Sequence, residues 1–128
     1  MAFEVPDFNL PTLTAASTAY SLKQYHCMVA SSSDNIAVTP SDSASMTGIM
    51  QNAPTNTGEE INLAVSGVSK AVYGTALTAG DNFIVGTSGR VASTAGAGAG
   101  AFIYGQVLVT GASSAIGSVL VNPLGIST

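Results

Sequence analysis

Residues 60–66 read Glu-Ile-Asn-Leu-Ala-Val-Ser, and this stretch decides the fold class because a large apolar side chain occupies every second position. In an extended strand, Ile61, Leu63 and Val65 would share one face and the residues between them the other. A period of two is typical of a strand with one face on a core. No stretch shows a sustained helical repeat, so the sequence predicts an all-β protein.

Further strand candidates lie on both sides of this stretch, and turn-forming residues separate them. They are residues 22–30, 36–39, 45–51, 68–73, 82–85, 90–92, 101–110 and 116–121. Short strands that recur at intervals of about 8 to 12 residues indicate a small β-barrel or a sandwich. The alternating Gly and Ala residues at 95–101 are expected to form a loop between two strands.

The strand expected at residues 101–110 is apolar on both faces. Phe102 and Tyr104 would point one way, whereas Ile103 and Val107 would point the other. This pattern is typical of a central strand or of a strand in an interface. We therefore expect Phe102 and Tyr104 to contribute to a protein interface.

Residues 1–14 are expected to form an extended arm that precedes a single β-rich domain at 15–128. Pro6 and Pro11 exclude a helix interior and favour extended backbone before them. The arm has too few residues to bury its own apolar side chains, so we expect these to pack on a neighbouring subunit. They are Phe3, Val5, Phe8, Leu10 and Leu13. The alternative, in which the arm is the first edge strand of its own domain, remains open.

Composition limits the partners that the chain can bind. Charged residues make up 8% of the 128 residues, against about 25% in ordinary soluble domains, while hydrophobic residues reach 46%. A largely neutral surface suits a subunit whose faces become covered by other proteins. The basic residues are Lys23, Lys70 and Arg90, too few to neutralise a run of phosphates, so no nucleic-acid partner is expected.

The cellular compartment is predicted from Cys27, from the first residues of the chain and from the apolar stretch at residues 91–109. A single cysteine forms no intrachain disulfide, which fits folding in a cytoplasm. Glu4 and Asp7 stand where a signal peptide needs basic residues. Residues 91–109 have the length of a spanning helix but contain four glycines, so we expect no membrane span.

One motif suggests a cofactor. Residues 109–117, Val-Thr-Gly-Ala-Ser-Ser-Ala-Ile-Gly, resemble the nucleotide-binding turn of short-chain dehydrogenases. In that family the turn opens a helix within a longer βαβ fold. Only eleven residues follow Gly117, and they suit a terminal strand. The motif therefore predicts a plain β-turn and no cofactor.

Adjacent titratable residues elsewhere in the chain also indicate no catalytic or metal site. His26 and Cys27 would point to opposite faces of a strand and so could not share a proton; we expect Cys27 in the core and His26 facing outward. Glu59 and Glu60 beside Gly58 read as a solvated turn. With one histidine and no Asp-rich loop, no metal site is expected. The sequence thus predicts no enzyme, no catalytic residue and no small-molecule substrate.

Several short segments occur in the order found in one family of phage proteins. They are residues 25–29 (Tyr-His-Cys-Met-Val), 48–54 (Gly-Ile-Met-Gln-Asn-Ala-Pro), 58–61 (Gly-Glu-Glu-Ile), 65–70 (Val-Ser-Gly-Val-Ser-Lys), 77–81 (Leu-Thr-Ala-Gly-Asp), 89–91 (Gly-Arg-Val) and 103–105 (Ile-Tyr-Gly). From about Tyr25 onward the chain resembles the small capsid cement (decoration) proteins of tailed phages.

The resemblance implies a β-rich subunit of the virion that binds outside the head, bridges neighbouring major capsid proteins and does no chemistry. It also implies a homo-oligomer, for which we expect a trimer, with a dimer as the alternative. A β-rich adhesion or carbohydrate-binding module of a virion or cell surface is the competing interpretation. Such modules usually cluster exposed aromatic residues, whereas this chain has no Trp.

Overall fold

The computed structural model describes residues 13–15, 18–30, 36–38, 45–95 and 101–126, and the regular structure within them is almost entirely β-strand. The strands are β1 Thr14–Ala15, β2 Cys27–Ala30, β3 Ile36–Val38, β4 Gly48–Met50, β5 Leu63–Ala64, β6 Gly67–Val72, β7 Asn82–Val85, β8 Val91–Ser93, β9 Phe102–Val107 and β10 Ile116–Ile126. Two short 3-10 turns, η1 Thr18–Leu22 and η2 Thr87–Gly89, complete the described elements. The all-β prediction is confirmed.

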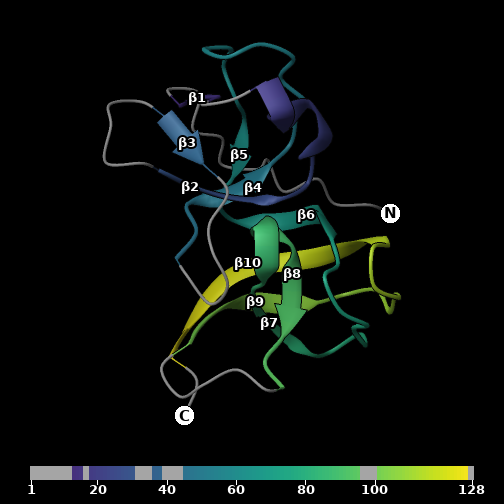
Figure 1. The fold of residues 1–128 in the computed structure, drawn as a ribbon. Helices are drawn as coiled ribbons and strands as arrows, with labels where there is room; N and C mark the ends of the chain where they lie inside the picture. The colour runs from purple at the N-terminus through teal and green to yellow at the C-terminus, as the bar shows by residue number, and fades with distance from the viewer. Residues whose placement is uncertain (1–12, 16–17, 31–35, 39–44, 96–100, 127–128) are drawn as a thin grey trace.

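The strands form two five-stranded sheets, one above the other in Figure 1. The upper half has the order β1-β3-β2-β4-β5, with β1 parallel to β3. The lower half has the order β6-β10-β9-β7-β8 and is antiparallel between neighbours. Tyr73, just after β6, bridges Val91 of β8, and the Gly74 N–H donates to the Val91 carbonyl at 2.8 Å. This contact brings the two edges of the lower sheet together as a small barrel.

Strands β2 and β4 lie between two hydrophobic cores. Cys27 of β2 and Ile49 of β4 face the lower core, whereas their neighbours Met28 and Met50 face the upper one. Successive side chains of a strand point to opposite faces, so β2 and β4 contribute side chains to both cores. The lower core also contains Ala71, Tyr73, Leu77, Phe83, Val85, Val91, Tyr104, Val107, Val119 and Val121. The upper core also contains Ala15, Tyr20, Ile61 and Leu63.

The strand predicted at residues 22–30 is shorter than expected. The chain turns twice before it, through hydrogen bonds from the Lys23 N–H to the Tyr20 carbonyl and from the His26 N–H to the Lys23 carbonyl. Tyr25 then adopts a left-handed backbone conformation, with φ 64°. An extended strand cannot pass through that conformation, so β2 begins only at Cys27.

The side chains of residues 60–66 point to the faces that the alternation predicts, but fewer of these residues than expected pair with a neighbouring strand. Ile61 and Leu63 are fully buried, as the alternation predicts. Only β5 pairs with β4, however, while Glu60 makes an isolated bridge to Thr14. Gly67 has φ 89°, which turns the chain into β6 and ends the run.

The last strand is longer than predicted. Residues 116–121 pair with β6, and residues 119–121 also pair with β9, so β10 is a central strand of the sheet. The ladder to β9 then shifts register between Val121 and Gly125 and resumes. Pro123 lies in this irregularity, where its missing N–H breaks no ladder hydrogen bond. The strand expected at residues 101–110, either central or in an interface, is β9 at Phe102–Val107, and it is central because it lies between β10 and β7. No helix among the described residues is long and apolar enough to cross a bilayer.

Candidate interaction surface

The first predicted interface residues lie at the start of β9. The rings of Phe102 and Tyr104 are 4.8 Å apart and tilted by 47°. Tyr104 is only 8% exposed, and its hydroxyl accepts a hydrogen bond from the Met46 N–H at 3.0 Å. Phe102 remains 36% exposed. Both interface roles stay predictions, and Phe102 is the more accessible of the two side chains.

The predicted arm lies mostly outside the described residues, which begin at Leu13. The part before Leu13 contains four of the predicted anchors: Phe3, Val5, Phe8 and Leu10. Leu13 packs, partly buried, against the upper core of its own domain, and its carbonyl accepts a hydrogen bond from the Ile61 N–H at 3.0 Å. The described end of the arm therefore contacts its own subunit, and its role in an interface stays a prediction.

A second apolar surface lies on the outside of the lower half. We name it the β6–β10 face; it consists of the cross-strand pairs Val68–Leu120, Lys70–Ser118 and Val72–Ile116, with Leu108 beside them. The residues between them, such as Ala71 and Val119, are buried, so the named residues must point outward. Ile116 is 58% exposed and Val68 47% exposed. Lys70 is the one charged residue of this face.

The β6–β10 face was not predicted from the sequence because β6 places small residues inward and larger ones outward. Ser69 points inward, where its hydroxyl donates to the Lys70 carbonyl at 2.8 Å and accepts from the Gln51 side chain at 2.9 Å. A buried hydroxyl with both partners carries little penalty. Hydropathy alone would have put Val68 inside, although the alternation of Val68, Lys70 and Val72 was a usable signal.

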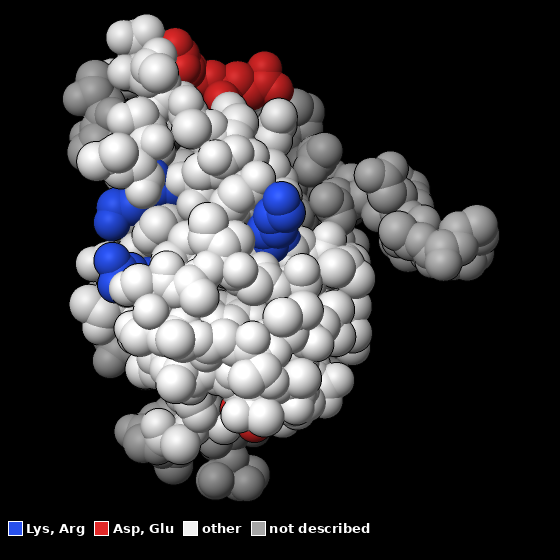
Figure 2. All heavy atoms as spheres, turned by 90° about the vertical axis from the view of Figure 1, so that its right-hand side faces the viewer, with Lys and Arg blue, Asp and Glu red and all other residues white. Residues whose placement is uncertain are grey.

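The three basic residues of the chain lie near Tyr25 and His26, where the two halves meet: the charges of Lys23 and Arg90 act on His26, and Lys70 lies over Tyr25. We name these three residues the basic belt. Figure 2 shows basic side chains at mid-height of one face and acidic ones at its top. The Lys70 ammonium lies 5.6 Å from the centroid of the Tyr25 ring. Positive charge that is scattered in the sequence is thus concentrated in the fold.

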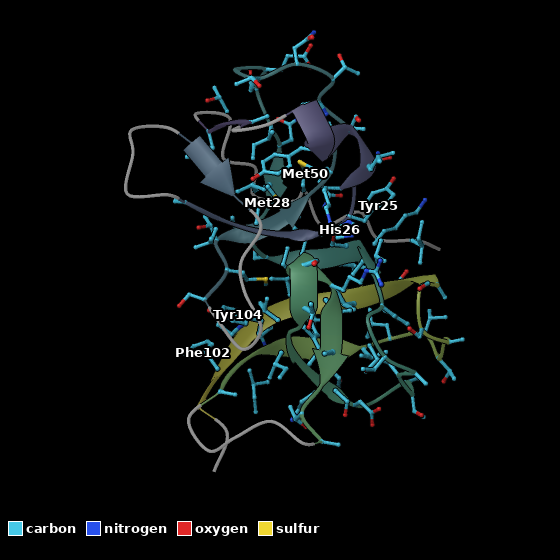
Figure 3. All side chains as sticks on the ribbon, in the orientation of Figure 1. Tyr25, His26, Met28, Met50, Phe102 and Tyr104 are labelled. Atoms are coloured by element: carbon cyan, nitrogen blue, oxygen red, sulfur yellow. The ribbon has the colours of Figure 1, made fainter. Side chains whose placement is uncertain are left out.

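His26 lies within this region, and the prediction that it faces outward is wrong. The side chain is only 6% exposed, and its Nδ1 lies 3.1 Å from the Gln24 carbonyl oxygen. Burial lowers the pKa of His26; the Gln24 contact opposes this, and the charges of Lys23 and Arg90 add to the lowering. The left-handed turn at Tyr25 places His26 between the two halves, a position that strand alternation cannot predict (Figure 3).

Cys27 points the other way, into the lower core, as predicted. Complete burial raises the pKa of its thiol to about 12. A thiol in that environment stays protonated and is a poor nucleophile. The prediction that Cys27 is a small core residue is confirmed.

The turn at residues 109–117 also has a structural explanation. It joins β9 to the antiparallel β10, so a strand follows it, as predicted. Tyr73 lies beneath it, and its hydroxyl donates to the Val109 carbonyl at 2.6 Å. A Cβ on Gly111 would lie 2.8 Å from the Tyr73 ring, and one on Gly117 would overlap the hydroxyl oxygen. The glycines of this motif make room for an aromatic ring.

The acidic turn is solvated, as the sequence indicates. The Glu59 carboxylate accepts hydrogen bonds from the Thr55 N–H at 2.8 Å and from the Asn56 side chain at 2.9 Å. These bonds, that of Thr55 first, lower the pKa of Glu59. Across the described ranges, no three His, Cys, Asp or Glu side chains gather as metal ligands would.

The fold is similar to that of a solved phage protein. The crystal structure of the N base of head fiber gp8.5 in bacteriophage phi29 superimposes with a TM-score of 0.65 and 11% sequence identity. The match covers 95% of this chain and 98% of the other. No protein-family model matches the sequence, and no curated protein is significantly similar to it. Nearly the whole chain therefore shares a known fold, while the resemblance to cement proteins stays a prediction.

Proposed function

We propose that this chain is a structural protein of a phage virion, which binds the outer surface of the head and bridges neighbouring major capsid proteins. The observation that carries the proposal is the fold, shared over nearly the full length of both chains with the base of a phage head fiber. That likeness supports a head-associated role. Bridging and stabilisation of the capsid are the finer part of the proposal and rest on the resemblance in sequence.

The surface of the molecule suits such a role. The β6–β10 face and Phe102 of β9 expose aliphatic and aromatic groups on three strands of the lower half. Exposed apolar patches on a folded protein commonly mark sites of protein contact. Interfaces of more than about 1,000 Å² are typical of stable assemblies, and many copies acting together strengthen them further. The proposed role requires no catalysis.

Oligomeric state is part of the proposal: a homotrimer, with a dimer as the alternative. Light scattering of the purified chain at micromolar concentration tests it directly. A mass of one chain under those conditions would contradict both forms.

The decisive experiment compares heads of the parent phage with and without this protein. Added protein should sediment with depleted heads and raise their resistance to heat. Phe102→Asp tests one exposed position, with Thr57→Asp, at an exposed turn of the upper half, as the matched control. Failure to sediment with heads, together with binding to host cells or glycans, would overturn the proposal and favour an adhesion module.

A further inference from the structure

We propose that the β6–β10 face and the adjoining basic belt bind residues 1–12 of a second copy of this chain. This contact rests on the homo-oligomer proposed above and specifies how its copies meet, but it does not depend on binding to the capsid. Three observations support it.

The first observation is the chemistry of the surface. The pairs Val68–Leu120 and Val72–Ile116 flank Lys70, so an aliphatic strip carries one central cation. Lys70 in turn lies over Tyr25, and the Val72 N–H donates to the Tyr25 carbonyl at 3.0 Å, which joins the strip to the belt. The surface therefore offers apolar contacts and positive charge side by side. Its occupant should be both apolar and acidic.

The second observation is the composition of residues 1–12, Met-Ala-Phe-Glu-Val-Pro-Asp-Phe-Asn-Leu-Pro-Thr. The segment contains two carboxylates, no Lys or Arg, and four of the predicted apolar anchors. Pro6 and Pro11 lack an N–H, so the segment suits packing across a sheet face through its side chains better than pairing as a new strand. Its charge and its apolar groups both complement the surface.

The third observation is the point where the segment joins the domain. The Ala15 N–H donates to the Glu59 carbonyl at 2.8 Å, and Thr14 bridges Glu60, so the segment starts beside two carboxylates of its own subunit. Like charges disfavour any arrangement that would bring Glu4 or Asp7 within the Debye length, about 10 Å, of this turn. Twelve extended residues span at most about 40 Å, far enough to reach an adjacent molecule. A second copy presents the opposite charge.

Disulfide trapping with the full chain tests the pairing. Asn9→Cys in one copy and Ser118→Cys in another should form a covalent heterodimer under mild oxidation when the two variants are mixed. Cys27 does not compete because it is buried in the lower core. Thr57→Cys, at the exposed acidic turn, replaces Ser118→Cys as the control and should trap no more than background.

Charge exchange supplies the second readout. Lys70→Glu should slow trapping by about fivefold, the effect of roughly 1 kcal/mol, and Glu4→Lys with Asp7→Lys should restore the rate. Circular dichroism checks that each variant is folded. Equal trapping at Thr57→Cys, or no dependence on Lys70, would overturn the proposal. A chain carrying both Asn9→Cys and Ser118→Cys that closes on itself in dilute solution would show that the segment binds its own subunit instead, which also overturns it.

Discussion

Tyr73 fills the space beneath the β9–β10 turn, and replacing Gly117 by alanine would intrude on it. The added Cβ would overlap the Tyr73 hydroxyl and crowd the ring, whereas Gly117 itself has a backbone conformation open to alanine. Overpacking of a close-packed core usually costs 1 to 3 kcal/mol, and the ring has no free side to move into because Tyr73 is fully buried. We expect a loss of about 3 kcal/mol in the free energy of unfolding.

The cause can be isolated by changing the residue that Gly117 accommodates. Tyr73→Leu removes most of the ring and the 2.6 Å hydrogen bond to the Val109 carbonyl, and should itself cost about 3 to 4 kcal/mol. In that background the alanine at position 117 meets empty space. Its cost should fall below about 1 kcal/mol, so the two changes are coupled by about 2 kcal/mol.

Equilibrium unfolding in urea measures all four proteins of this cycle. Midpoints and slopes give the free energies if the transition is two-state. Tyr73→Phe is the graded control: it removes the hydroxyl but keeps the ring atoms that the Cβ would also approach, so Gly117→Ala should remain costly there. Strictly additive costs, or a Gly117→Ala protein within 0.5 kcal/mol or so of the parent, would refute the reasoning.

Three further predictions concern buried or half-buried side chains. Burial lowers the pKa of His26 below its ordinary 6.5, so the unfolded state binds more protons than the folded state does. The free energy of unfolding should therefore fall from pH 7 to pH 5, by less than about 1.4 kcal/mol per pH unit. His26→Gln should flatten this dependence in urea titrations, and an unchanged slope would contradict it. Cys27, with a thiol pKa of about 12, should react with a maleimide only after denaturation; rapid labelling of the native protein would show otherwise. Phe102→Ser should lower the free energy of unfolding by roughly 1 kcal/mol or less because the ring is partly exposed, whereas Tyr104→Ser should lower it by about 3 kcal/mol or more. Thermal melting measures both variants, and equal losses would be inconsistent with the packing of β9.

The lower half was predictable from sequence because its strands alternate over enough residues to define two faces. β7 has the predicted bounds, Asn82–Val85, and the turn before β10 lies where Gly and Ser cluster. β7 itself is buried from Phe83 to Val85, and the turn residues around it set its bounds. In β6 the period of two holds, because Ser69 and Ala71 are buried while Val68 and Lys70 are exposed. The physical rule and the structure agree there.

The upper half was less predictable because its strands are short and enclosed. β2 and β4 carry buried residues on both faces, so Met28 and Met50 are as buried as their neighbours and no alternation appears. The backbone hydrogen bonds of Tyr20 and Lys23 replace a strand by turns, and Tyr25 adopts a conformation that a tyrosine rarely selects on its own. Tertiary contacts decided this region, and local pattern could not report them.

The basic belt, like the upper half, results from tertiary contacts that no local sequence pattern predicts. Lys23, Lys70 and Arg90 are far apart in the sequence, and the fold brings them together because β2 packs on the lower core. In a chain with so few charges, three cations in one region are a larger part of the electrostatic field than they would be elsewhere. Four of the seven acidic residues belong to segments outside the described ranges, and two of those four lie within residues 1–12. Any contact that depends on charge should therefore involve this belt, and salt should weaken self-association more than it weakens the fold.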